Sequence, residues 1–172
     1  MIERQGVFTF RGKPVTVIGE DLKTGDVAPE FEVLNQDFEN FKGLEGTNGK
    51  VRVIASVPSL ETSVCDRETR RFNQDAANLS KDISILVISE DTPYTQKRWC
   101  GAAGIDQVVV LSDHLLKDFG TKYGVLLKEV GVLRRAVFVV DQNNIVRYAA
   151  YMPELGIEPD YEQVLAVAGT LI

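Results

Sequence analysis

The order of apolar segments along the chain predicts a mixed α/β fold. Three short, β-branched runs have the composition of strands inside a sheet, and segments with helical periodicity alternate with them. Two further strands around a polar turn and a last helix follow. These observations predict a central sheet of mixed strand direction flanked by helices. The three buried runs are Val51–Ser56, Ile83–Ser89 and Val108–Ser112.

The segment before the first buried run predicts additional strands. Gly6–Gly19 contains two β-prone runs around an Arg-Gly-Lys turn, which is typical of a β-hairpin. Phe31–Leu34 begins another strand, and a short strand near Phe38–Phe41 is expected within a loop rich in Asp, Asn and Gly.

The remaining elements follow from capping residues and periodicity. Apolar residues at helical spacing run from Cys65 to Leu79, and helices are also expected at Thr92–Cys100, His114–Gly120 and Asp160–Leu171. Ala136–Asp141 and Ile145–Tyr151 are expected to form a hairpin. No repeat or linker interrupts the pattern, so residues 1–172 are predicted to form one domain.

Composition and charge exclude several function classes. The chain has 172 residues, is 44% hydrophobic and carries a net charge of −6, so it gains no counterion-release affinity for nucleic acids and no attraction to anionic lipid. No segment has the apolar length of a signal peptide or a membrane span. We therefore expect a cytoplasmic protein, in which two cysteines are redox-active or incidental rather than a permanent cross-link.

Cys65 occupies a position suited to sulfur chemistry. It follows a buried strand, and Thr62 and Ser63 are good helix N-caps, with Asp66 completing a capping box. The N–H groups and dipole of a helix N-terminus favour a thiolate, which is the nucleophilic form of cysteine. The nearby acids, among them Glu68, oppose ionisation, so a cation from elsewhere in the chain is required.

Three separated motifs resemble one enzyme family. Pro58-x-x-x-Thr62-x-x-Cys65 matches the peroxiredoxin signature. PSLETSVCDRETRRFN is similar to the thiol peroxidase branch, whose members are atypical two-cysteine peroxiredoxins. RWCGAAG around Cys100 resembles the segment of the resolving cysteine, RRAVFVVD the segment of the active-site arginine, and PDYEQVLAV the last helix. Ser63 stands where this branch often has Gly or Pro. The resemblance implies a thioredoxin-like fold with an added N-terminal β-hairpin.

The resemblance also implies a reaction and its residues. Cys65 would attack hydrogen peroxide or an organic hydroperoxide and become a sulfenic acid, which Cys100 would resolve by an intrachain disulfide. Thr62 and Arg135 would position the peroxide and stabilise charge, and Pro58 would shield the loop. Thioredoxin would reduce the disulfide, the protein would form a homodimer, and no metal or organic cofactor is implied. Disulfide Cα atoms lie within about 7 Å of each other, a distance that two cysteines on separate helices rarely meet in a packed, reduced protein. We therefore predict that one or both helix ends unwind locally during turnover.

The residues themselves leave alternatives open. Cys65 can be an inert buried thiol, Cys100 a core cysteine beside Trp99 or half of a structural disulfide, and Thr62 only an N-cap. Spacing alone does not distinguish Arg134 from Arg135. A disulfide oxidoreductase and a non-enzymatic redox sensor are rival functions, although Cys65 lacks the Cys-x-x-Cys partner of the former.

The other polar residues are assigned to the surface. Glu90, Asp91 and Asp113 are expected at solvated strand ends, and the single histidine, His114, at a helix cap or on the surface. The choice between hydrogen peroxide and organic hydroperoxides depends on pocket shape, which these patterns leave open.

Overall fold

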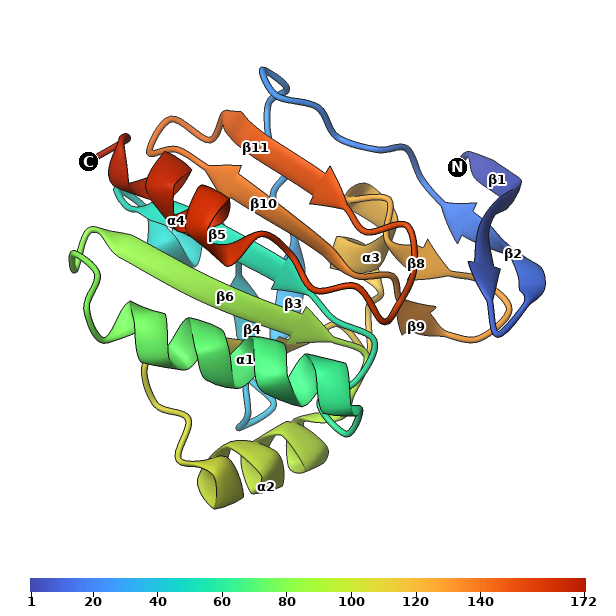
Figure 1. Cartoon of the computed structure of the whole chain (residues 1–172), viewed down its shortest axis with the longest axis horizontal. Helices are drawn as coiled ribbons and strands as arrows, with labels where there is room; N and C mark the ends of the chain where they lie inside the picture. The colour runs from blue at the N-terminus through green and yellow to red at the C-terminus, as the bar shows by residue number, and fades with distance from the viewer.

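The computed structural model describes residues 1–172 and contains two sheets and four α-helices (Figure 1). The strands are β1 (Glu3–Phe10), β2 (Lys13–Ile18), β3 (Glu32–Leu34), β4 (Asn40–Lys42), β5 (Val51–Ser56), β6 (Ile83–Ser89), β7 (Val109–Ser112), β8 (Leu126–Leu127), β9 (Val132–Leu133), β10 (Ala136–Val140) and β11 (Val146–Tyr151). The helices are α1 (Ser63–Ala76), α2 (Pro93–Ala103), α3 (Asp118–Lys122) and α4 (Tyr161–Gly169), with a 3₁₀ turn at Glu45–Thr47.

The larger sheet has seven strands in the order β11-β10-β5-β6-β7-β3-β4. The three runs predicted as buried strands form its parallel centre, β5, β6 and β7, and antiparallel pairs flank them on both sides. Every residue of β5 is buried, as expected for a strand covered on both faces. The predicted mixed sheet is therefore confirmed.

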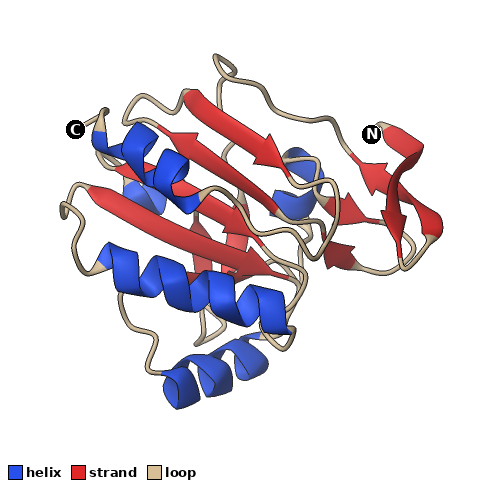
Figure 2. Cartoon of the chain, viewed as in Figure 1, coloured by secondary structure: helices blue, strands red, loops and turns tan.

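Helices cover both faces of this sheet (Figure 2). Alternate residues of β5 point to opposite faces. Val53 belongs to the core beneath α1, α2 and α4, together with Phe72, Trp99 and Val164. Its neighbour Ile54 belongs to the core on the other face, where the side chains of α3 pack. The two cores bury the apolar faces of the helices and hold them against the sheet.

The predicted N-terminal hairpin is confirmed, with β1 and β2 paired antiparallel around Arg11 and Gly12. It is part of a second, smaller sheet of order β1-β2-β8-β9. Strands β8 and β9 are two residues each and were not predicted, because so short a pairing leaves no period-two pattern. A small core of its own, which includes Phe8 and Leu127, holds this sheet together.

The predicted helices are present with shifted ends. Helix α2 continues past Cys100 to Ala103 and ends at Gly104, which adopts a left-handed conformation with φ of 70°. The helix predicted at His114–Gly120 is displaced: α3 spans Asp118–Lys122, and His114 is exposed on the preceding turn. None of the helices combines the length and hydropathy that a membrane-spanning segment needs. That residues 1–172 form one domain stays a prediction.

Candidate active site

Cys65 lies at the start of α1, just beyond the carboxyl end of β5. Ser56 ends the strand, and the loop from Val57 to Thr62 leads into the helix. Thr62 is the N-cap, because its hydroxyl oxygen accepts a hydrogen bond from the Cys65 N–H at 3.4 Å. The Cys65 side chain points into the protein and has no exposed surface. The helix thus presents the sulfur to buried partners rather than to bulk water.

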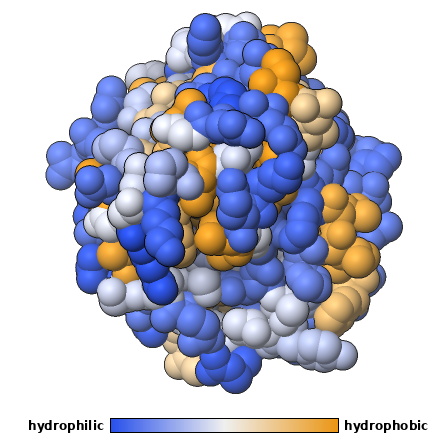
Figure 3. Space-filling model, turned by 90° about the vertical axis from the view of Figure 1, so that its right-hand side faces the viewer, coloured by the Kyte–Doolittle hydropathy of each residue, from blue (hydrophilic) through white to orange (hydrophobic).

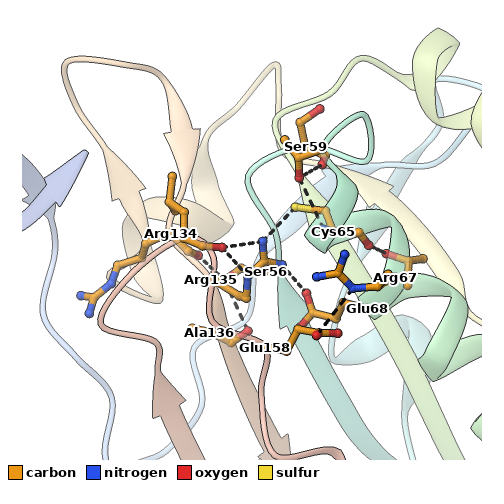
Figure 4. A network of polar contacts seen from close by, with 12 residues as sticks. Ser56, Ser59, Cys65, Arg67, Glu68, Arg134, Arg135, Ala136 and Glu158 are labelled. Atoms are coloured by element: carbon orange, nitrogen blue, oxygen red, sulfur yellow. Dashed lines mark hydrogen bonds and ion pairs between the residues drawn. The ribbon is translucent and has the colours of Figure 1, made fainter. Parts of the chain in front are cut away.

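The partner of this sulfur is Arg135, which precedes β10. Its Nη2 donates a hydrogen bond to Cys65 Sγ at 3.2 Å and a second one to the Leu155 carbonyl at 2.9 Å (Figure 4). Nε also donates to Leu155 O, at 3.1 Å. The guanidinium is 1% exposed, so its orientation is fixed by these bonds and by burial. The structure thus places a permanently charged group from a distant part of the chain in contact with the sulfur.

A buried carboxyl group holds the other end of Arg135. Glu68, on α1 one turn after Cys65, has no exposed surface and accepts a hydrogen bond from Arg135 Nη1 at 2.6 Å. Burial raises the pKa of Glu68 to about 7, against the charge of Arg135. Burial opposes the charge on Arg135, but Glu68 and Cys65 outweigh it and raise the pKa of the guanidinium. Glu68 therefore acts on Cys65 through Arg135.

The structure separates the two adjacent arginines that spacing alone leaves equivalent. Arg134 points away from the sulfur and toward the N-terminal hairpin, where its guanidinium lies over the ring of Phe8, 5.4 Å from the centroid. It also lies over the ring of Tyr151 in β11, 4.7 Å from the centroid. It also forms an ion pair with Asp21 at 3.4 Å. Neighbouring residues of an extended chain point in opposite directions, so only one of the two can reach Cys65.

A cavity of about 650 Å³ lies at the loop that leads into α1, with Thr62, the N-cap, in its wall. Its walls come from the loop before α1, from the β1–β2 turn and from the segment after β11, and include Pro58, Thr62, Phe10 and Leu155. The side of the molecule that carries the hairpin is mostly hydrophilic, and apolar atoms gather there in separate patches (Figure 3). Thr62, which caps α1 above Cys65, forms part of the wall, so the cavity and the sulfur lie on either side of the same short loop.

Cys100 lies on a different helix, within α2, and is 6% exposed. Burial raises the pKa of the Cys100 thiol, and a hydrogen bond from Gln36 Nε2 to Sγ at 3.5 Å partly offsets this effect. Both cysteines are free thiols. The structure therefore brings Thr62 and Arg135 into contact with Cys65 and places Pro58 in the cavity wall beside Thr62, whereas Cys100 lies in a different helix, α2.

The expectation of solvated strand ends is wrong for Glu90 and Asp113, which are buried, whereas Asp91 is half-buried. Asp113 is 1% exposed and accepts hydrogen bonds from the N–H groups of Phe119 and Gly120 in the first turn of α3. The Glu90 side chain is 5% exposed and pairs with Lys117. These acids follow directly after buried parallel strands, where the next side chains still lie under neighbouring loops. His114 is exposed, and no three potential ligands cluster as a metal site would require.

With a helix-capped cysteine held by a buried arginine at the carboxyl edge of a mixed sheet, fold and site point to one class of enzymes, the peroxiredoxins. The chain belongs to the AhpC/TSA family, whose model matches residues 24–149. This confirms the predicted enzyme class, and the relatives below confirm the resemblance to the thiol peroxidase branch.

Two curated relatives cover nearly the whole chain. The thiol peroxidase of Oceanobacillus iheyensis is 52% identical over 92% of this chain and 95% of its own length. The thiol peroxidase of Bacillus subtilis is 48% identical over 95% of this chain and 97% of its own length. Among solved structures, a peroxiredoxin-like protein from Aquifex aeolicus is 38% identical, covers all of both chains and superposes with a TM-score of 0.88. The predicted thioredoxin-like fold is thereby confirmed.

Proposed function

We propose that the protein is a thiol-dependent peroxidase that reduces hydroperoxides with Cys65 as the nucleophile. The observation that carries this proposal is the 3.2 Å hydrogen bond from Arg135 Nη2 to Cys65 Sγ at the N-terminus of α1. A buried, permanently charged donor at this distance stabilises a thiolate and is also placed to bind the oxygen that the thiolate attacks.

In the first step, the Cys65 thiolate attacks the terminal oxygen of the hydroperoxide. An S–O bond forms, the O–O bond breaks, and the leaving oxygen takes a proton to depart as water or an alcohol. Cys65 becomes a sulfenic acid and is thereby oxidised by two electrons. Arg135, Thr62 and the Cys65 N–H would hold the two oxygens in line and stabilise the developing negative charge. Pro58 would keep the loop in place.

In the second step, the Cys100 sulfur attacks the Cys65 sulfenic acid, a disulfide forms and water leaves. An external dithiol protein, for which we propose thioredoxin, then reduces this disulfide by thiol–disulfide exchange. Both cysteines become thiols again, and the dithiol is oxidised to a disulfide. Because the two cysteines lie in different helices, α1 and α2, we expect one or both helix ends to unwind locally before the sulfurs bond. The family resemblance supports this route for recycling.

The cavity supports organic hydroperoxides alongside hydrogen peroxide as substrates. It is far larger than hydrogen peroxide needs, and Pro58, Phe10 and Leu155 give it an apolar lining against which a hydrocarbon group can pack. We also propose a homodimer and a cytoplasmic location. The former rests on the family resemblance, and the latter on the sequence, whose two cysteines are expected to be redox-active rather than a permanent cross-link.

Rapid mixing of the reduced protein with one equivalent of hydrogen peroxide or cumene hydroperoxide tests the proposal. The single tryptophan, Trp99, adjoins Cys100 and reports the reaction by fluorescence, and intact mass identifies the product. Fast consumption with loss of two hydrogen atoms supports a peroxidase with an intrachain disulfide. Reaction at the rate of an ordinary thiol would contradict it and favour a redox sensor. Peroxide-independent exchange with protein disulfides would favour a disulfide oxidoreductase.

A further inference from the structure

The side chain of Asp91 fastens the loop that precedes Cys65. Its Oδ1 accepts a hydrogen bond from Ser59 Oγ at 2.7 Å, and its Oδ2 accepts one from the Leu60 N–H at 2.8 Å. Oδ2 also accepts from Ser89 Oγ at 2.8 Å. Ser59 lies in the loop beside Cys65 (Figure 4), and Leu60 is buried. One carboxylate therefore holds the backbone and a side chain of the loop against the end of β6.

The same residue marks the start of the segment that carries Cys100. Asp91 immediately precedes Thr92, the N-cap of α2, and the Asp91 carbonyl accepts a hydrogen bond from Ser112 Oγ. The buried Gln96 ties the first turn of α2 to the same strand end, because its Nε2 donates to Ser89 Oγ at 3.1 Å. Asp91 is thus fixed to β6, β7 and α2 at once.

A second contact joins these two segments on the outside. Arg98, near the middle of α2, forms an ion pair with Glu61 in the loop before Cys65. Both side chains are more than half exposed, so solvent screens this pair and it contributes little. The charge-assisted hydrogen bonds of the half-buried Asp91 are the stronger connection between the loop and the base of α2.

We propose that Asp91 is a positioning residue that holds the Pro58–Thr62 loop to the base of α2 and so acts as a lock. The arrangement that reacts with peroxide and the packed position of Cys100 in α2 are then formed together and lost together. This inference rests on the proposed function. While the lock holds, Thr62 caps α1 and Arg135 faces Cys65, and Cys100 is kept in its helix. When it opens, the loop and the start of α2 lose a shared anchor, and the two sulfurs can approach.

The lock therefore affects the two chemical steps in opposite directions. Attack on peroxide needs the ordered loop, and disulfide formation needs the disordered one. In Asp91→Asn, the side-chain amide keeps the shape but offers one acceptor oxygen where the carboxylate offers two, and it brings N–H donors toward existing donors. We expect the second-order rate constant with peroxide to fall about tenfold and the first-order rate constant of disulfide formation to rise about threefold or more.

The experiment is stopped-flow mixing with hydrogen peroxide at several concentrations, with Trp99 fluorescence as signal. The rate of the first phase rises with peroxide concentration, whereas the rate of the second phase does not. Acid quench followed by intact mass assigns the phases: the sulfenic acid of the first has gained one oxygen, and the disulfide of the second has lost two hydrogens relative to the reduced protein. Ser59→Ala is the second variant, since it removes the side-chain hydrogen bond to Asp91 and leaves the one from the Leu60 N–H. Asp82→Asn, at an exposed aspartate before β6, is the matched control.

Opposite shifts of the two rate constants in Asp91→Asn and smaller shifts of the same signs in Ser59→Ala support the lock. Rate constants within twofold of wild type in both variants would overturn it. So would a slowing of both steps together, which a general loss of structure produces. If wild type and Asp82→Asn themselves react at the rate of an ordinary thiol, the proposed function has failed, whatever Asp91 does.

Discussion

Arg135 Nη2 donates a hydrogen bond to Cys65 Sγ across 3.2 Å, although the two residues are 70 positions apart in the chain. The contact exists because β10, which begins next to Arg135, pairs antiparallel with β5, which leads into the helix of Cys65. Ala136 lies opposite Ser56 in this register. The sheet thereby delivers the cation to the thiol at the edge where both strands meet the loop.

Replacing Arg135 should slow the reaction of Cys65 with peroxide. Arg135→Ala removes both the charge beside the sulfur and a donor to the attacked oxygen, so we expect the second-order rate constant to fall about 100-fold. Stopped-flow mixing with peroxide measures it. Because the change also leaves the buried Glu68 without its partner, unfolding must be monitored in parallel.

Arg134→Ala is the matched control for this prediction. Its guanidinium lies over Tyr151 and beside Asp21, so the variant should lose about 1 kcal/mol of stability or more, with a peroxide rate constant close to wild type. Equal slowing by both substitutions would assign the effect to loss of structure rather than to contact with the sulfur.

Cys100→Ser should separate the two chemical steps. The variant keeps Cys65, Arg135 and the cavity, so it should consume one equivalent of peroxide at the wild-type rate and accumulate the sulfenic acid. Turnover in the presence of thioredoxin and its reductase should stop. Mass spectrometry after single turnover detects the added oxygen. Continued recycling at the normal rate would show that Cys100 is not the resolving cysteine.

Arg52 should be a structural arginine with no effect on chemistry. It is fully buried in β5 and donates to the carbonyls of Leu44 and Asp141 at 2.6 and 2.7 Å and to the hydroxyl of Thr47 at 2.9 Å. Arg52→Met leaves these acceptors without donors and should lower the free energy of unfolding by about 3 kcal/mol. Urea denaturation measures the loss.

The control for Arg52 is Arg147→Met. Arg147 also contacts Asp141, but its side chain is 47% exposed, so solvent screening limits the expected loss to about 1 kcal/mol. Both variants should react with peroxide at the wild-type rate. A comparable loss of stability in the two would mean that burial of Arg52 does not determine its contribution.

Glu90 should make stability depend on pH. Burial and the neighbouring Asp113 carboxyl raise its pKa to about 9, whereas an unfolded glutamate titrates near 4.3. Between these values the unfolded chain releases a proton that the folded protein keeps, so stability is highest at low pH and declines as pH rises. Glu90→Gln mimics the protonated form. Relative to wild type it should gain about 2 to 4 kcal/mol between pH 5 and pH 8.

Denaturation curves at the two pH values measure this difference. Glu162→Gln, at an exposed glutamate on α4, gives the background change. A constant difference between Glu90→Gln and wild type at both pH values would show that Glu90 is ionised in the folded protein throughout this range.

Local patterns were sufficient to predict the central sheet and the position of Cys65. Buried parallel strands are continuous apolar runs, and the Thr62 cap marks the start of α1 within one residue. The choice of Arg135 came from the family resemblance rather than from spacing. Geometry gives the reason for it: only Arg135 of the pair faces α1.

Long-range contacts were beyond the reach of those patterns. Strands β8 and β9 exist because Leu126 and Leu127 meet β2 from more than a hundred residues away. The burial of Arg52 and Glu90 was missed because charged residues are mostly exposed. Their partners, a carbonyl group for Arg52 and a carboxyl group for Glu90, come from distant parts of the chain and leave no local pattern. The role of Glu68 as partner of Arg135 needed the fold, since the sequence shows only an acid near a thiol.

The complete burial of Cys65 makes the sulfur selective by access as well as by reactivity. A bulky alkylating agent or a glutathione disulfide cannot touch it while the loop is closed, however nucleophilic the thiolate is. The rate at which such a reagent labels Cys65 therefore counts openings of the loop, in the way that amide exchange counts openings of a hydrogen bond. The labelling rate of Cys65 therefore measures how often the loop opens, which is the motion that the proposed catalytic cycle requires.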